Sequence, residues 1–371
     1  MVGEIRYSYA PRDWDQERFL GLGGFVVVFL NYNKVKFIGE SVASALNQDY
    51  PLLEMFFMDD ASTDGSGDIM ERLVREYRGR HKVTVVWNSE NQNITGQWNI
   101  VSKLATGYWY GMFCADDIAH KDRVSVVSRR IAQYPSLRGL CTAVNAIDVF
   151  TREKKTFGVC ADVVQSGKVS LEPLCRQNPP IIGATAWWHR DLFKERLPKG
   201  PLDDVILRWI LQCKYDGFED AVWMWVGESK TIDYSLGCGV SSPGRDGRVP
   251  TNRVDEWLSC KARIRSFAEI SFKTWVGLKE YYLRIGAKGK YLSIADSMQC
   301  YYACVTGNTV KRICQFPKII SLILDRANDN GVVLMAVRTW IKLLIQEFFG
   351  CRFAAIVSCY IIHRNNSREF A

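Results

Sequence analysis

Residues 25–30 have the sequence FVVVFL. All six residues are apolar, and the consecutive valines favour extended backbone. A continuous apolar run of this length, bounded by polar residues, is typical of a strand that is buried on both faces of a parallel sheet. The chain therefore has a buried strand close to its beginning, and the segments around that strand decide how the sheet continues.

Strands alternate with helices over the next ninety residues. We expect further strands at 53–58, 83–87 and 108–114, and helices at about 37–46, 67–77 and 96–105. Alternation of this kind implies right-handed crossovers between parallel strands. The sequence therefore predicts an α/β fold of Rossmann-like type, with a mostly parallel sheet flanked by helices. Ligands of such sheets bind beyond the carboxyl ends of the strands.

The regular alternation of strands and helices becomes looser after residue 137. Strand-like pieces lie near 139–148 and 181–188, and a Gly/Ser/Pro/Arg-rich segment at 237–253 is typical of a mobile loop. After residue 254 the sequence predicts helices to the end. We therefore divide the chain into an N-terminal binding and catalytic domain, 1–250, and a helical C-terminal region, 251–371.

Composition bounds the function. Of 371 residues, 47% are apolar and 24% are charged, which is usual for a globular protein. The net charge of +8 suits a phosphate-bearing ligand or an anionic membrane surface, but no dense basic stripe indicates nucleic-acid binding.

The sequence also bears on membrane insertion and secretion. No apolar stretch reaches the roughly 18 residues of a membrane span, and residues 1–18 are too polar for a secretory signal. We expect a cytoplasmic protein with reduced cysteines. The apolar segment 332–349 either packs on the catalytic domain or makes peripheral contact with the inner face of the membrane.

Polar clusters follow the first two strands. Asn31, Tyr32 and Asn33 come after the first strand, and Asp59 and Asp60 come after the second. Carboxylates at strand ends can accept hydrogen bonds from a pyrimidine N–H and from ribose hydroxyls. The residues at 62–64, Ser-Thr-Asp, also suit the cap of the following helix, and the two roles are compatible.

A third cluster, Asp116 and Asp117, follows the strand at 108–114. Two adjacent carboxylates suit a hard divalent cation, Mg²⁺ or Mn²⁺, whose remaining ligands are phosphates and water. The alternative is a simple loop in which one aspartate caps the next helix.

The ordered set of clusters resembles the family-2 glycosyltransferases with the GT-A fold, from residue 23 to about 245. The matching residues are Asn31 to Asn33, Ser41 to Pro51, Asp59 to Ser66, Glu90 and Asn91, Gly96, Asn99, and Cys114 to Asp117. The resemblance implies that a nucleotide-diphosphate sugar is bound by Asn31, Tyr32, Asn33, Asp59, Asp60, Asn91, Gly96, Asn99 and Asp116. It further implies that Asp116 and Asp117 hold the metal. Cys114 departs from the pattern, because the family has an aspartate there.

Asp203 and Asp204 resemble the family's acidic pair, whose second member is the catalytic base in inverting enzymes. By this resemblance Asp204 accepts the proton of the attacking acceptor hydroxyl. The alternative is that both residues are the acidic first turn of a helix, favoured by the helix dipole. Asp203, Trp187 and Trp188 are candidates for the acceptor side, although tryptophans at such positions also pack in cores. Arg245 and Arg248, in the loop at 237–253, either close over the diphosphate or stay solvated.

The function that we expect is transfer of a hexose, with inversion, from a nucleotide-diphosphate sugar to a glycan or lipid-linked acceptor. A surface polysaccharide or lipopolysaccharide is the expected product. Alternatives are a polyprenyl-phosphate sugar transferase and a catalytically degenerate nucleotide-sugar-binding scaffold. A processive synthase would carry membrane helices and a QxxRW motif, and a nucleotidyltransferase would carry a Gly-rich basic loop where residues 31–33 stand.

Overall fold

The computed structural model describes residues 3–148, 153–157, 161–166, 182–200, 202–236 and 253–306. The chain divides into two compact units, Met1–Val249 and Pro250–Ala371. The loop at 237–252, with Arg245 and Arg248, and the apolar segment 332–349 lie outside the described residues.

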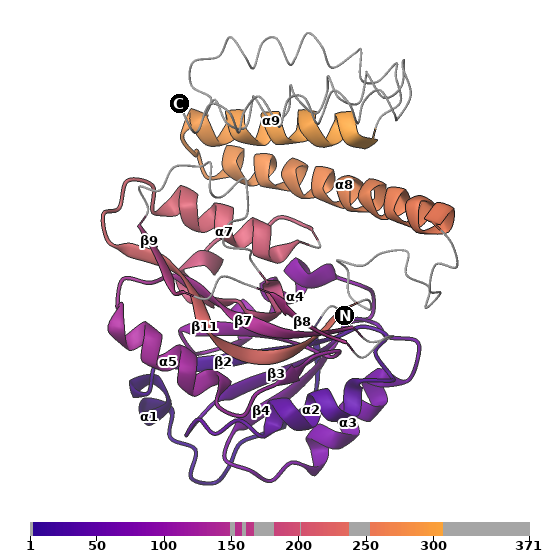
Figure 1. Ribbon diagram of the computed structural model, residues 1–371. Helices are drawn as coiled ribbons and strands as arrows, with labels where there is room; N and C mark the ends of the chain where they lie inside the picture. The colour runs from indigo at the N-terminus through magenta and orange to yellow at the C-terminus, as the bar shows by residue number, and fades with distance from the viewer. Residues whose placement is uncertain are drawn as a thin grey trace. The chain divides into compact units, whose positions relative to one another are not determined.

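The first half of unit 1 is the alternating arrangement that the sequence predicts. The strands are β2 (Phe25–Asn31), β3 (Glu54–Asp59), β4 (Lys82–Trp87) and β5 (Trp109–Cys114), and they pair in parallel in the order β4-β3-β2-β5. The helices between them are α2 (Ile38–Leu46), α3 (Ser66–Glu76) and α4 (Asn93–Leu104). Figure 1 shows α2 and α3 on one face of the sheet and α4 on the other. All strand ends that carry predicted polar clusters therefore meet at one edge of the sheet.

The second half of unit 1 makes the sheet mixed. β10 (Trp187–His189) runs antiparallel between β5 and β7 (Gly139–Asp148), and the long strand β11 (Ala221–Leu236) pairs in parallel with β7. The remaining strands are all antiparallel to their partners: β1 (Glu4–Tyr9) on β4, β6 (Ile118–Ala119) and β9 (Val163–Ser166) on β11, and β8 (Lys154–Phe157) on β7.

Sequence reasoning missed five of these strands and misjudged another segment. The strands that were not predicted are β1, which is largely exposed and polar, β6, β8 and β9, which are only two to four residues long, and β11, whose start is rich in tryptophan. Within the strand expected at 181–188, Gly183–Thr185 form the 3₁₀ turn η1, and Trp187 and Trp188 belong to the short strand β10.

The core of unit 1 forms around β2, whose seven residues are all buried. Phe25, Val27 and Phe29 contact one layer of helices, and Trp187 from β10 packs edge-on against Phe25 at 5.6 Å between ring centroids. Full burial of such side chains stabilises the fold by roughly 1.5–3 kcal/mol each. The central strands are therefore a rigid base for the loops that follow them.

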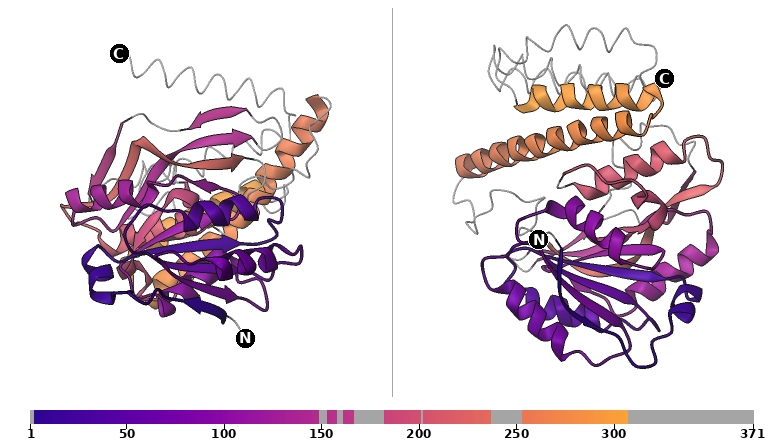
Figure 2. Two further views of the ribbon diagram at one scale, coloured as in Figure 1. Left: turned by 90° about the horizontal axis from the view of Figure 1, so that it is seen from below. Right: turned by 180° about the vertical axis from the view of Figure 1, so that it is seen from behind.

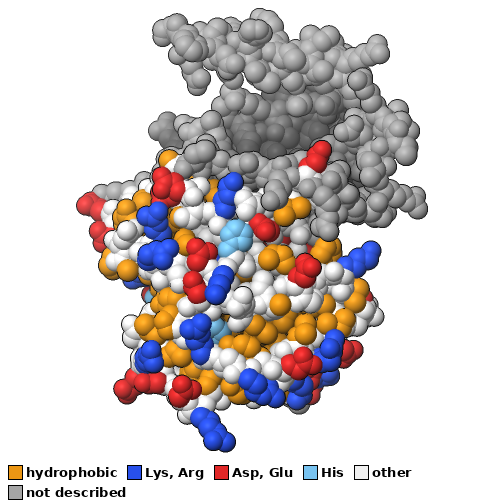
Figure 3. Space-filling model, turned by 60° about the horizontal axis from the view of Figure 1, so that its bottom comes forward, with side chains coloured by type: hydrophobic (Ala, Val, Ile, Leu, Met, Phe, Trp, Pro, Cys, Tyr) orange, Lys and Arg blue, Asp and Glu red, His pale blue; other side chains and the backbone are white. Residues whose placement is uncertain are grey.

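Four further helical elements belong to the described part of unit 1. They are α1 (Gln16–Gly21), α5 (Arg123–Gln133), the 3₁₀ turn η2 (Arg190–Phe193) and α7 (Asp203–Lys214). Figure 2 shows the same layers from below and from behind. In Figure 3, one face of this unit carries small groups of basic and acidic side chains with hydrophobic side chains between them. This face therefore presents no field of a single charge.

The described part of unit 2 consists of α8 (Arg253–Arg284) and α9 (Gly289–Thr306). Tyr282 of α8 packs against Tyr291 of α9 at 5.6 Å, and Lys279 donates to Asp296 at 2.8 Å. Gly286, with φ +64°, makes the turn between the helices in a conformation that favours glycine. Among the described residues, no helix combines the length and the apolar character needed to cross a membrane.

Candidate functional site

Side-chain hydrogen bonds join the first two polar clusters at the ends of β2 and β3. Asn31 and Asp59 are paired in the sheet register, and the Asn31 side chain donates to Asp59 Oδ1 at 2.7 Å and to Ser66 Oγ at 3.0 Å. The second Asp59 oxygen accepts from the amide of Ser62 at 2.9 Å. Hydrogen bonds to a charged group contribute roughly 1.5–3 kcal/mol each. Both predicted donor-binding residues are buried here, where they shape the loop that follows β3.

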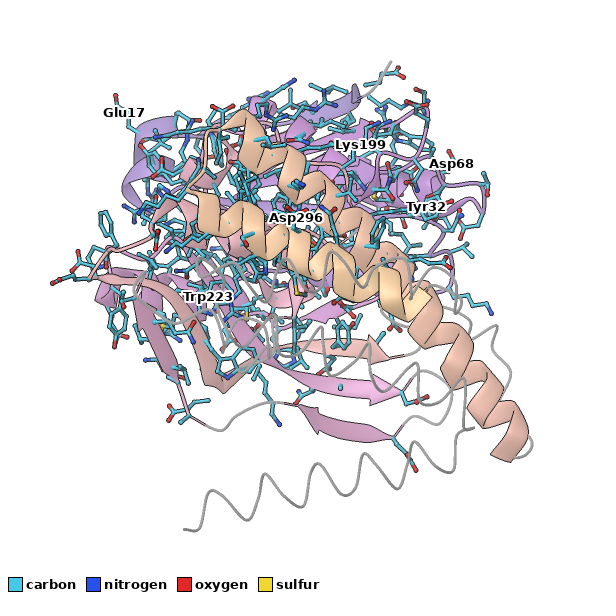
Figure 4. All side chains as sticks on the ribbon, turned by 90° about the horizontal axis from the view of Figure 1, so that it is seen from above. Glu17, Tyr32, Asp68, Lys199, Trp223 and Asp296 are labelled. Atoms are coloured by element: carbon cyan, nitrogen blue, oxygen red, sulfur yellow. The ribbon has the colours of Figure 1, made fainter. Side chains whose placement is uncertain are left out.

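Asn33 joins the same two loops at the surface. Its φ of 53° is left-handed, a conformation that asparagine tolerates better than most residues. Its side-chain oxygen accepts from the amide of Thr63 at 2.8 Å, and its own amide donates to Ser62 Oγ at 3.1 Å. Tyr32, labelled in Figure 4, is 48% exposed. Tyr32 thus presents an exposed aromatic ring beside these loops.

Asp60 lies deeper, with 2% of its surface exposed. One carboxylate oxygen accepts from the side chain of Asn88 at 3.0 Å and from the amide of Gln92 at 2.8 Å. Burial raises the pKa of Asp60, and these hydrogen bonds oppose the shift. Asn91, in the adjoining loop, accepts from the amide of Asn93 at 3.0 Å. The loops after β3 and β4 are therefore bound to each other through Asp60.

The end of β5 carries three potential metal ligands, Cys114, Asp116 and Asp117. One donor atom from each lies within 4.8 Å of the others. Asp117 Oδ1 accepts from the amide of Ser235 in β11 at 2.8 Å, while its buried Oδ2 has no hydrogen-bond partner. Asp116 Oδ2 pairs with Lys34 Nζ at 2.7 Å. Sequence reasoning missed Lys34, which has no signal beyond its place in the loop after β2.

The donor set fits a divalent cation through its two carboxylates. A buried carboxylate oxygen without a partner is costly, and a cation would satisfy it. Burial and the charges of Asp117 and Asp116 raise the pKa of the Cys114 thiol well above its ordinary value. A protonated thiol adds no charge to the site, and Mg²⁺ and Mn²⁺ prefer oxygen ligands. Asp116 and Asp117 are therefore the residues that would hold the ion.

Arg123 lies beneath this cluster with 1% of its surface exposed. Its Nη2 donates to the carbonyl of Met112 in β5 at 2.6 Å and to the carbonyl of Ala184 in η1 at 2.8 Å. Burial lowers its pKa to about 9, which leaves the guanidinium charged at neutral pH. Arg123 thus ties β5 to η1 and places a fixed positive charge below Asp117 and Cys114. The sequence offered only the weak signal of an arginine beginning an otherwise apolar helical turn.

The acidic pair begins α7. Asp203 is 3% exposed and accepts from the indole N–H of Trp98 at 2.9 Å. Burial, together with the charge of Asp204, raises the pKa of Asp203 to about 7. Asp204 is half-buried, and burial raises its pKa as well, while Arg208 one turn later lowers it. An ionised Asp204 with a raised pKa has the properties of a general base.

The acidic pair and the β5 cluster belong to one region. A methyl group at Gly183 in η1 would lie 3.6 Å from Asp203 Oδ1, 3.5 Å from Asp204 Cβ and 3.0 Å from Met112 Cε. The charge of Asp203, like those of Asp116 and Asp117, contributes to the raised pKa of Cys114. The structure therefore brings the end of β5 and the start of α7 together across η1.

Two sequence-based assignments need correction. Trp187 and Trp188 are both 0% exposed: Trp187 is part of the core, and Trp188 stacks on Trp223 at 5.2 Å. The prediction that either lines an acceptor site is wrong, because the antiparallel strand β10 lies in the middle of the sheet.

Asn99 makes hydrogen bonds that the sequence did not predict. Its amide donates to the carbonyl of Leu197 at 3.1 Å and accepts from the amide of Leu197 at 2.8 Å. Gly96, on the same helix, lies close to Gln92, whose Cβ would be 2.6 Å from an added methyl group. The Asn99 amide is thus engaged with the segment before α7.

Comparison with known proteins gives a family match. Residues 26–196 match the family model described as glycosyl transferase family 2. Chondroitin synthase of Escherichia coli is 28% identical over 167 residues, which are 41% of this chain and 24% of that protein. An uncharacterised glycosyltransferase of Nostoc sp. is 25% identical over 218 residues, 57% of this chain and 62% of its own length. The chain thus spans less than two thirds of either relative.

Among solved structures, residues 1–349 of S. aureus TarS in complex with UDP-GlcNAc superpose with a TM-score of 0.49 at 13% identity. That superposition covers 87% of this chain and 91% of the TarS chain.

Proposed function

We propose that this chain, which belongs to glycosyl transferase family 2 over residues 26–196, transfers a sugar with inversion from a nucleotide-diphosphate sugar to an acceptor hydroxyl. The proposal rests on one observation: two pairs of aspartates lie on either side of η1. Asp116 and Asp117 lie at the end of β5, and Asp203 and Asp204 lie at the start of α7. An inverting displacement needs a charged donor site on one side and a proton acceptor on the other.

The donor side consists of the loops after β2, β3 and β5. Tyr32 presents an exposed ring, and the loop held by Asn31, Asn33 and Asp59 has a fixed shape. Asp116 and Asp117 would hold Mg²⁺ or Mn²⁺, which neutralises charge on a departing diphosphate. Lys34, paired with Asp116, keeps a positive charge at the same place.

The acceptor side is Asp204. Asp204 lies in the first turn of α7, and burial raises the pKa of its carboxylate. It would accept the proton of the acceptor hydroxyl while that oxygen forms the new bond to the anomeric carbon, and the nucleoside diphosphate leaves with the electrons of the broken bond. Because one displacement inverts the configuration, no covalent nucleophile is needed.

We further propose that the acceptor is a glycan or lipid-linked saccharide in surface polysaccharide biosynthesis. The relative named chondroitin synthase supports this class, since chondroitin is a polysaccharide. A polyprenyl phosphate as acceptor is the second candidate, and a peripheral membrane location would accompany either lipid-linked acceptor.

The test starts with binding. A thermal-shift panel of UDP- and GDP-sugars, with and without Mn²⁺, should identify a donor, because a ligand of the native state raises its stability by mass action. Release of nucleoside diphosphate is then measured for the parent, Asp204→Asn and Asp116→Ala. We expect Asp204→Asn to keep the Mn²⁺-dependent thermal shift and to lose roughly 10²–10⁴-fold in turnover.

Asp116→Ala should lose the Mn²⁺-dependent shift itself. Binding without turnover in the parent would instead favour the degenerate scaffold, and a parent that binds no nucleotide sugar would refute the proposal.

A further inference from the structure

One face of α4 is bonded to the segment that leads into the acidic pair. Thr95, Trp98 and Asn99 are spaced by three and four residues, so they share one face of the helix. Opposite them lie residues 197–200, which come shortly before Asp203 and include Lys199, labelled in Figure 4. About a hundred residues of chain separate the two.

The contacts are reciprocal hydrogen bonds. The Thr95 hydroxyl donates to the carbonyl of Gly200 at 2.9 Å and lies 3.0 Å from the amide of Gly200, which donates to it. Asn99 both donates to and accepts from the backbone of Leu197. The Trp98 indole then donates to Asp203 Oδ2 at 2.9 Å. Each of these hydrogen bonds joins α4 to a residue that lies shortly before Asp204 in the chain.

The hydrogen bonds of Thr95 and Trp98 are buried, and those of Asn99 are partly buried. Thr95 and Trp98 are fully buried, and Leu197 and Gly200 are buried too. Buried polar groups that lose a partner carry the full cost of their desolvation, so the pairing specifies one arrangement of the segment. Trp98 also packs on Phe193 of η2 at 5.4 Å, so that its ring is held in place independently of its N–H.

From these contacts we infer that Trp98, assisted by Thr95 and Asn99, is a positioning residue of the sugar transfer: it fixes Asp203 and thereby the orientation of Asp204 toward the acceptor hydroxyl. The inference rests on the proposed function. It gives a physical reason for the polar residues Thr95 and Asn99 on the face of α4 that contacts the segment before the acidic pair. Small misplacements of a reacting group lower rates by up to about 10²-fold, so such a brace matters for catalysis beyond its effect on stability.

The test compares three variants. Trp98→Phe removes the indole N–H and keeps a ring, and Thr95→Val removes the hydroxyl and keeps the shape. Trp225→Phe is the matched control, because Trp225 is equally buried and its indole nitrogen has no hydrogen-bond partner. Two measurements are made on the full chain: hydrogen exchange at the amides of Gly200 and of residues 203–206, and kinetics with the UDP- or GDP-sugar that gives the largest thermal shift.

We expect Trp98→Phe and Thr95→Val to speed exchange at these amides and to lower kcat by about 10- to 100-fold, with the donor KM within about twofold of the parent. Trp225→Phe should change neither exchange nor kinetics. The inference is overturned if Trp98→Phe behaves like Trp225→Phe, or if exchange rises while kcat stays at the parent value. Full activity in Asp204→Asn, by contrast, would refute the proposed role of the base and leave the exchange result standing.

Discussion

Substitution of Arg123 by methionine tests whether a buried guanidinium holds the end of β5 against η1. Arg123→Met keeps an unbranched side chain but leaves the carbonyls of Met112 and Ala184 without their donor. Each buried acceptor left unpaired costs about 1–3 kcal/mol. The variant also avoids the cost of burying a charge, which offsets part of the loss. We therefore expect a net loss of about 3 kcal/mol in the free energy of unfolding.

The measurement is urea unfolding at pH 7.5, where Arg123, with a pKa of about 9, is charged. Arg190→Met is the control, because Arg190 is exposed and its side chain makes a 3.4 Å hydrogen bond to the carbonyl of Thr106 and lies 5.8 Å from the centre of the Tyr108 ring. That variant should stay within about 0.5 kcal/mol of the parent. If Arg123→Met unfolds at the same urea concentration as Arg190→Met, the guanidinium does not brace β5, and our account of how the Asp117 region is held would be refuted.

Two further predictions concern stability. Burial lowers the pKa of His81 from 6.5 to about 4, so the folded state holds the neutral ring. Its contribution is complete above pH 6.5 and is lost as the pH falls from there toward 4; by pH 5 the loss is about 2 kcal/mol. Urea unfolding at pH 7.5 and pH 5.0 should show this loss of unfolding free energy in the parent and a smaller loss in His81→Leu. An equal loss in both proteins would contradict the prediction. A methyl group at Gly107 would lie 2.3 Å from the carbonyl oxygen of Gly24, so Gly107→Ala should cost about 1–3 kcal/mol in thermal unfolding. Gly39→Ala, whose methyl group would meet nothing within 4 Å in α2, should instead be neutral or stabilising, and a similar loss in both variants would count against the clash.

Local sequence determined the parallel half of unit 1. The apolar run at 25–30 predicts β2, because a strand that is buried on both faces is apolar at consecutive positions. The helical spacing after it predicts α2, because a helix that is buried along one stripe is apolar at every third or fourth position. The polar residues at the strand ends could be located for the same reason, since a strand's end is marked where its apolar run stops. The later antiparallel strands carry weaker signals, and β11 was missed because its partners, β7 and β9, lie 50 or more residues away.

The partners of polar and aromatic side chains were decided only by tertiary structure. Asn99 is bonded to Leu197, Trp98 to Asp203, and Arg123 to Ala184, and each pair is separated by about 60 to 105 residues. No local pattern specifies such partners, because the contact exists only after β5, η1 and α4 have packed together. The same reasoning applies to Trp187, whose burial follows from the place of β10 between β5 and β7. The periodicity of apolar residues along the chain indicates which residues are buried. Which residues they contact depends on how distant segments of the chain pack together.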